Sequence, residues 1–334
     1  MTPRVRAVLL AAGISVVASV LPGASPVAAD SAGPTDYRSE ISGVEPATDE
    51  ISVTIEGGDA FVRIVAVPGT EVLLFGYEGE PYLRIDAAGT VVENRRSPAT
   101  YLNQDRYGSE VPESASADAE PEWVVVARNG AYAWHDHRAH RMDPFAPLNA
   151  SRGDTVLDGV IPIAVDGRAV SILVTTRWMP TPSPWPAILG AVIGTAATVL
   201  AATAGRVAPV VAVTAAAATV VGWAQYRSLP GETGPVAAWW LLPLVALGFA
   251  VVGVLLGSSP SAHAATAIAA VQVGLWGYTR RDGLRRAILP TDAPFWLDRF
   301  VGAAAVTVGL VGAAVALVAL VKPPEPQTPL RSPA

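Results

Sequence analysis

Five apolar runs fill the C-terminal part of the sequence and constrain its fold more than any other feature. None contains Asp, Glu, Lys or Arg, and each has about the 20 residues that cross a hydrocarbon core of about 30 Å. In water, such helices would have no polar face to present. We therefore predict an all-α bundle of about five transmembrane helices over 181–321, in a lipid bilayer, with a short proline-rich tail at 322–334. The predicted spans are 186–205, 207–226, 236–257, 261–279 and 300–321.

The N-terminus has the pattern of a secretion signal. Arg4 and Arg6 precede the apolar stretch 7–21, and small residues lead to a predicted cut between Ala29 and Asp30. We predict a signal peptide at 1–29, with an uncleaved anchor as the alternative. Either way, the segment that follows is expected outside the cytoplasm, in a multi-pass protein of the cell membrane.

This topology conflicts with the positive-inside rule. Five crossings put the 280–299 loop, with five arginines, on the outer side, whereas the rule prefers arginines in the cytoplasm. One interpretation is that a span is miscounted, most simply the alanine-rich 261–279. The other is that the loop faces the acidic segment 30–180, which holds 24 Asp and Glu against 12 Arg. We favour five spans.

Residues 30–180 show alternating apolar and polar positions broken by turn residues. The stretches 51–57 and 60–67 flank a Gly-Gly-Asp turn, and 161–178 contains Asp166-Gly167 between two alternating runs. Eight or nine short strands with polar turns predict an antiparallel β-sandwich. The fold class is therefore a multidomain one, with an all-β extracytoplasmic domain ahead of the helices.

Three of the four histidines fall within six residues, at His135, His137 and His140, with Met142 just beyond. If 131–138 is a strand, His135 and His137 share a face, and His140 and Met142 join them only across a bulge. Imidazoles suit copper or zinc, and thioether sulfur favours Cu(I). The chain has no cysteine, so thiolate sites and disulfides are excluded. The alternatives are a structural role, with hydrogen bonds to Asp136 or Asp143, and a pH-responsive contact.

A polar loop with aromatic residues runs from 94 to 107 and is too long for a simple turn. It is a candidate ligand- or partner-binding loop. The alternative is a loop folded onto the sandwich by arginine–carboxylate bonds, for which Glu78 and Glu80 are candidate partners. The candidate binding residues are Arg95, Arg96, Tyr101, Asn103, Asp105 and Arg106.

Several of these segments together resemble a group of actinobacterial multipass membrane proteins with a secreted β-domain. The likeness rests on 68–85, 94–108, 134–142, 161–172 and 177–184. Where that group has an aromatic residue after the third histidine, this chain has Arg141. The architecture is also similar to that of bacterial copper-handling membrane proteins, in which a periplasmic β-sandwich works with a multipass partner. That likeness implies copper at the histidine cluster.

No catalytic motif of the G-x-S-x-G, Walker or H-E-x-x-H type is present. Secretion and an acidic domain disfavour nucleic acid as a partner. We therefore expect a non-enzymatic integral membrane protein whose β-domain binds a ligand or an envelope or membrane protein. Copper handling at the histidines is the alternative. A sensor would require a membrane partner to carry its signal.

Overall fold

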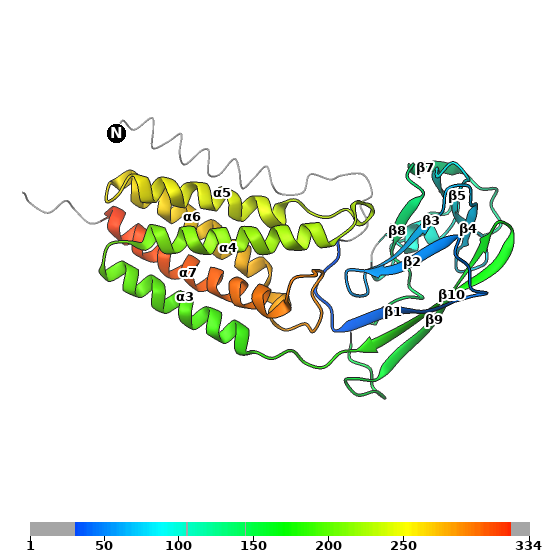
Figure 1. Cartoon of the computed structure of the whole chain (residues 1–334), viewed down its shortest axis with the longest axis horizontal. Coiled ribbons are helices and arrows are strands. Elements are labelled where there is room, and N and C mark those ends of the chain that lie inside the picture. Colours follow the sequence, from blue (N-terminus) through cyan, green and yellow to red (C-terminus); the bar gives the residue numbers. More distant parts are fainter. Residues whose placement is uncertain (1–30, 105, 144, 322–334) are drawn as a thin grey trace, which may run out of the picture.

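The computed structural model describes residues 31–104, 106–143 and 145–321. An antiparallel β region forms the N-terminal part and a bundle of long helices forms the C-terminal part, as Figure 1 shows. The predicted signal peptide at 1–29 and the predicted tail at 322–334 lie outside the described residues, as does Asp105.

The β region contains two antiparallel sheets. One has the strand order β1-β10-β9-β4-β5-β6-β7 and the other the order β2-β3-β8. The strands are β1 (Tyr37–Glu45), β2 (Ile51–Glu56), β3 (Phe61–Ala66), β4 (Val72–Phe75), β5 (Pro81–Ile85), β6 (Val91–Asn94), β7 (Trp123–Ala127), β8 (Ala131–Trp134), β9 (Thr155–Val165) and β10 (Arg168–Trp178). A short helix, α2 (Ala99–Leu102), follows β6.

The turn signals in the sequence place the hairpins correctly, with one exception. The β2–β3 pair closes at the Gly-Gly-Asp turn, and the β9–β10 pair closes at Asp166 and Gly167, both with positive φ. The Arg128-Asn129-Gly130 turn also predicts a hairpin, and that prediction is wrong. Strand β7 pairs with β6 whereas β8 pairs with β3, so the chain crosses there from one sheet to the other.

One hydrophobic core contains side chains from both sheets. Val62 and Ile64 of β3 are fully buried with Leu74 of β4, Ile163 of β9 and Ile172 of β10. These positions alternate with more exposed residues along each strand, as expected for strands with one buried face. Burial of these side chains is the main favourable contribution to the stability of the β region.

The C-terminal part consists of long apolar helices that run back and forth. The helices are α3 (Trp185–Thr203), α4 (Val207–Ser228), α5 (Ala238–Leu255), α6 (Pro260–Thr279) and α7 (Phe295–Val321). By length and hydropathy, α3, α4, α5 and α7 can each cross a membrane, whereas α6 is the least apolar and does not meet that criterion. The bounds agree with the predicted spans except that α7 begins earlier and includes Asp298 and Arg299.

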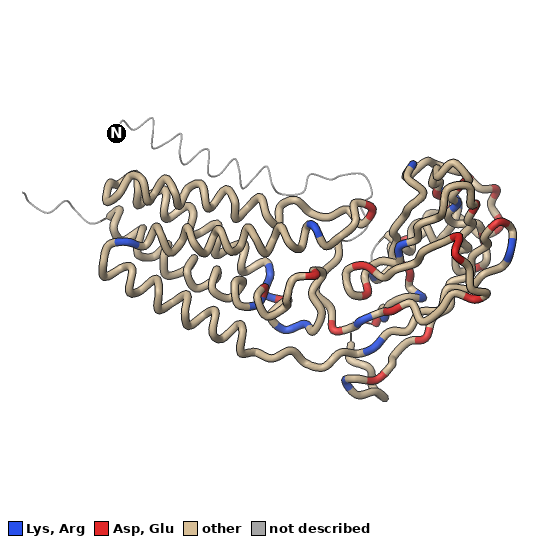
Figure 2. The backbone as a smooth tube through the Cα atoms, viewed as in Figure 1, with Lys and Arg blue, Asp and Glu red and all other residues tan. Residues whose placement is uncertain are grey.

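The β region rests on one end of the bundle, which we call the junction end. Figure 1 shows the α3 start, the α4–α5 connection and the α6–α7 connection at this end, and Figure 2 shows charged residues gathered there and in the β region. Backbone hydrogen bonds join Thr35 to Ile288 at 3.0 and 2.8 Å. Phe61 shares a small buried cluster with Leu229, against which Trp239 packs. The two parts therefore meet through both polar and apolar contacts.

Candidate functional site

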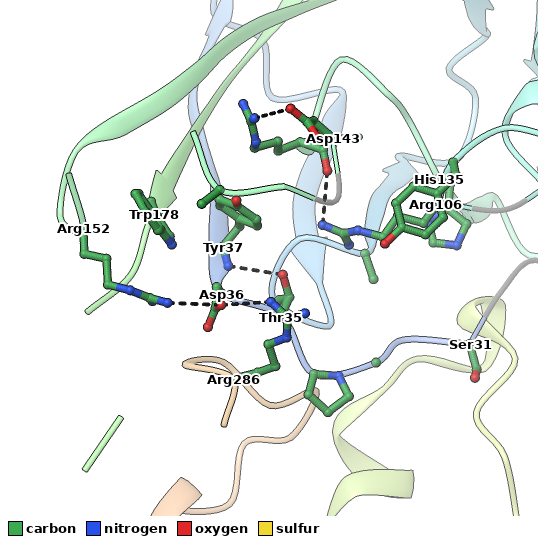
Figure 3. A pocket seen from close by; sticks show the side chains of 16 residues that line it. Ser31, Thr35, Asp36, Tyr37, Arg106, His135, Asp143, Arg152, Trp178 and Arg286 are labelled. Carbon is green, nitrogen blue, oxygen red and sulfur yellow. Dashed lines mark hydrogen bonds and ion pairs between the residues drawn. The ribbon is translucent and has the colours of Figure 1, made fainter. Parts of the chain in front are cut away.

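A cleft of about 290 Å³ lies where the β region meets the bundle. We call it the junction cleft. Its wall comes from the segment before β1, the loop after α2, the loop between β8 and β9, the end of β10 and the α6–α7 connection. Figure 3 shows its polar side chains converging from these separate segments.

Four arginines line the junction cleft, and they come from three separate connections of the chain. They are Arg106, Arg141, Arg152 and Arg286. Arg152 also lies over the Trp178 ring, with its guanidinium carbon 4.9 Å from the ring centroid. Stacking of this kind fixes the plane of a guanidinium group. The edge of the Arg152 guanidinium donates to the Met179 carbonyl oxygen at 2.8 Å and to Asp36 at 3.3 Å.

Asp36 connects the β region to the bundle within this cleft. Its carboxylate accepts hydrogen bonds from the Ala287 backbone N–H at 3.0 Å, from Arg286 at 2.9 Å and from Arg152 at 3.3 Å. Burial acts to raise the pKa of Asp36, but these hydrogen bonds and the charge of Arg152 outweigh it and lower the pKa. Asp36 is therefore ionised at neutral pH and is shared by two arginines from different halves of the chain.

The other two arginines have their own carboxylates. Arg141 donates to Asp143 at 2.6 Å, and Arg106 donates to the buried Asp59 at 3.0 Å. Four guanidinium groups thus face three carboxylates. The Nε atom of Arg141 is also buried without a hydrogen-bond partner among the described residues. The cleft therefore carries one uncompensated positive charge, which is the electrostatic requirement for an anion site.

The histidine cluster adjoins the cleft, but its geometry differs from the predicted strand. Strand β8 ends at Trp134, so the expected alternation over 131–138 is wrong: His135 and Asp136 are both buried, and the chain turns through His137 to His140. Asp136 explains the early end, because it accepts from the Trp134 indole at 2.9 Å and from Arg138 at 2.8 Å.

The turn nevertheless brings the three imidazoles together. The His140 ring lies 5.4 Å from the His137 ring and 6.1 Å from the His135 ring, centroid to centroid, and His135 stacks on Phe61 at 4.4 Å. Met142 follows at the surface with 37% of its side chain exposed. Among the described residues, no group of three or more His, Asp or Glu side chains has the arrangement of a metal site.

His140 is the most deeply buried member of this cluster. Its two ring nitrogens have no hydrogen-bond partner that meets distance and angle criteria among the described residues. Burial, together with the nearby positive charge of Arg106, lowers the pKa of His140 to about 3. The imidazole is therefore neutral at physiological pH, and its lone pair is a potential ligand for a metal ion.

Most of the predicted binding loop is folded onto the β region. Arg95 pairs with Glu93 at 3.2 Å, and Arg96 pairs with Glu122 at 3.1 Å. The Tyr101 hydroxyl donates to the Arg95 carbonyl oxygen at 3.1 Å. These contacts match the alternative of a loop closed by arginine–carboxylate bonds.

The carboxylates that close the loop are not those suggested by the sequence. Glu80 is buried and accepts from the Ser97 hydroxyl at 2.7 Å instead of from an arginine. Asn103 is also buried and accepts from the Tyr77 hydroxyl. Of the candidate residues in 95–106 that the structure describes, Arg106 is the one that lines the junction cleft.

Several residues of the junction cleft were not singled out in the sequence. Asp36, Tyr37 and Arg152 belong to no motif, and Trp178 was named only within the resemblance segment 177–184. The sequence pointed to the cleft through the candidate residues Arg106 and His135, and through the contrast between the acidic segment 30–180 and the arginine-rich loop that contains Arg286. That contrast predicted the pairing of these segments and left open which residues form it.

Comparison of the chain with protein-family models, with curated proteins and with solved structures gave no match. The class of protein is defined here by its architecture, a two-sheet antiparallel β region joined to a bundle with helices of membrane-spanning length.

Proposed function

We propose that this chain is a non-enzymatic integral membrane protein whose β-sandwich binds an anionic ligand in the junction cleft. The observation that carries this proposal is that Arg152 and Arg286 share the single carboxylate of Asp36. A phosphate or carboxylate group between them would supply the missing negative charge through charge-assisted hydrogen bonds. A protein partner bound through the 94–107 loop is less well supported, since Arg95 and Arg96 already pair with Glu93 and Glu122.

We also propose that the β-sandwich lies outside the cytoplasm and that all of α3 to α7 cross the membrane. Helix α5 runs away from the junction end and α7 starts at that end, so the chain between them must return through α6. The lower hydropathy of α6 fits its position, because most of its surface packs against other helices and many of its alanines are buried. The predicted signal peptide supports the outward orientation.

The anion site can be tested on full-length protein in detergent. Sodium phosphate is titrated against sodium chloride of equal ionic strength while the melting temperature is followed. Phosphate that binds only the folded state raises the melting temperature increasingly as its concentration exceeds its dissociation constant. We expect this rise for the native chain and its loss in the double variant Arg152→Gln, Arg286→Gln.

Arg168→Gln is the matched control, because Arg168 forms a surface pair with Glu50 and does not line the cleft. It should respond to phosphate as the native chain does. An equal rise in the double variant, or no rise in the native chain, would contradict the proposed anion site.

A second candidate function is copper handling at the histidine cluster. It is favoured by one observation, the contact of three imidazole rings around a buried His140 whose nitrogens have no partner among the described residues. His135, His137 and His140 would be the ligands, and Met142 would have to turn inward to join them.

Titration of the full-length protein with Cu(I), Cu(II) and Zn(II) tests this second function. Binding tighter than about 1 μM, equivalent to about 8 kcal/mol, is expected. It should be lost in the variant His135→Ala, His137→Ala and kept in His263→Ala, which removes the histidine of α6. Failure of all three metals to bind at this level would exclude copper handling.

A further inference from the structure

We infer that the anion held in the junction cleft is the phosphate of an anionic phospholipid from the outer leaflet. This inference rests on the proposed anion site and names the class of its ligand. Three observations carry it: the position of the cleft along the bundle, the apolar loop at its edge, and the size of its excess charge.

The cleft lies close to where the chain enters the bundle. Trp178 lines the cleft, and only residues 179–184 separate it from Trp185 at the start of α3. Trp185 is 64% exposed at that helix end, the position in which tryptophan anchors at the membrane interface. Arg286 lies in the connection between α6 and α7, also at the junction end. A lipid headgroup beside the bundle is therefore within reach of the cleft.

The loop at the edge of the cleft, residues 141–143 and 145–152, which we call the rim loop, presents apolar side chains to the outside. Phe145 is 77% exposed and Leu148 is 98% exposed. The loop is tied to other segments at both ends, since the Arg141 carbonyl oxygen accepts from Arg106 at 3.5 Å and Arg152 donates to the Met179 carbonyl oxygen at 2.8 Å. Large apolar side chains held outward beside an arginine-lined cleft match an amphipathic ligand, whose phosphate and hydrocarbon portions need different surroundings.

The charge of the cleft also fits this ligand. A phosphodiester carries one negative charge, and the four guanidinium groups of the cleft exceed their three carboxylates by one. Arg286 and Arg152 both line the cleft, the Arg286 side chain is half exposed, and both donate to Asp36, so they form a pair of donors on one side of the ligand. The favoured ligand thus has a net negative charge, as phosphatidylglycerol has and phosphatidylcholine lacks.

The test uses full-length protein in nanodiscs made of equal parts phosphatidylglycerol and phosphatidylcholine. Native mass spectrometry counts the lipids that stay bound after release from the disc. We expect the native chain to retain phosphatidylglycerol in preference to phosphatidylcholine. Arg152→Gln, Arg286→Gln should lower this retention at least about tenfold, which corresponds to the loss of about 1.4 kcal/mol.

The double variant Phe145→Ser, Leu148→Ser tests the lipid portion of the ligand and should also lower retention. Val124→Ser, Val125→Ser is its matched control, because these valines are exposed on β7 and do not line the cleft. Arg168→Gln controls for the loss of arginine charge.

Free glycerol 3-phosphate, added as a competitor, separates the two sources of phosphate. If it binds the native chain as tightly as the lipid does and the rim-loop variant is unaffected, the lipid is overturned while the anion site stands. If Arg152→Gln, Arg286→Gln retains phosphatidylglycerol as the native chain does and its melting temperature still responds to phosphate, both the lipid and the anion site are overturned.

Discussion

His140 shows how one buried side chain can make the whole β region sensitive to pH. Its pKa is about 3 in the folded protein, because burial and the charge of Arg106 disfavour the protonated ring, against about 6.5 in an unfolded chain. A lowered pKa means that the unfolded state binds the proton more readily. The contribution of the neutral His140 ring to the free energy of unfolding is therefore complete above about pH 6.5, and it falls progressively as the pH decreases toward 3.

We expect the free energy of unfolding to fall by a few kcal/mol over this range, at about 1.4 kcal/mol per pH unit. Chemical denaturation at a series of pH values measures it. His140→Leu, which cannot take up a proton, should flatten the decline, and His263→Ala should leave it in place. A decline of the same steepness in His140→Leu would show that another group is responsible.

Arg106 and Arg96 are both paired arginines, but only one pair is buried. The Asp59 partner of Arg106 has 1% of its side chain exposed, whereas Arg96 and its partner Glu122 are 44% and 60% exposed. Arg106→Ala should cost about 3 to 5 kcal/mol, because it leaves Asp59 charged and unpaired in the interior. Arg96→Ala should cost about 1 kcal/mol or less. Equal losses in denaturation experiments would refute the structural role assigned to Arg106.

At the scale of single elements, glycine contacts determine how closely the helices approach. Gly190, Gly194 and Gly253 lie at such contacts, because a Cβ atom added at each would lie 2.1 to 2.7 Å from an atom of a neighbouring helix. Gly248 does not, since nothing lies within 4 Å of its added Cβ atom.

Gly190→Ala should therefore separate α3 from α7. Its Cβ atom would lie 2.1 Å from the Phe300 carbonyl oxygen, and relief of such a clash costs about 1 to 3 kcal/mol. Gly248→Ala is the matched control and should be neutral or slightly stabilising, because alanine is the better helix former. Melting temperatures of both variants in one detergent compare them directly. A similar loss at Gly248 would contradict the helix contacts described for α3.

Local signals in the sequence predicted the strands and helices well. Pairings between segments far apart in the chain could not be predicted from it. Hairpins such as β9–β10 follow from adjacent strands and a turn that needs positive φ at Asp166 and Gly167. The pairing of β8 with β3 joins segments about 70 residues apart and has no turn signature. The end of β8 at Trp134 depends on hydrogen bonds from Trp134 and Arg138 to the buried Asp136, which alternation alone does not reveal.

For the whole molecule, the candidate site could be predicted only as a contact between two oppositely charged segments. Asp36 and Arg286 are 250 residues apart, and their hydrogen bond depends on the docking of the β region against the bundle. In the proposed orientation the arginine-rich loop departs from the positive-inside rule, and the same docking supplies a physical reason for this departure. Arg280 pairs with Asp298, and Arg299 donates to the backbone carbonyl oxygens of Gly283 and Ala287. Arginines neutralised or enclosed in this way contribute less to orientation than free charges do.

The proposed orientation can be tested with single cysteines, since the natural chain contains none. Ser116 is exposed in the β region, Ser258 is exposed between α5 and α6, and Asp292 is exposed between α6 and α7. In intact cells, a membrane-impermeant maleimide should label Ser116→Cys and Asp292→Cys but not Ser258→Cys. Permeabilisation should then make Ser258→Cys reactive, which controls for its accessibility. If α6 did not cross the membrane, Asp292→Cys would be protected together with Ser258→Cys. Labelling of Ser258→Cys alone would place the β region in the cytoplasm, where the junction cleft could not reach the outer leaflet.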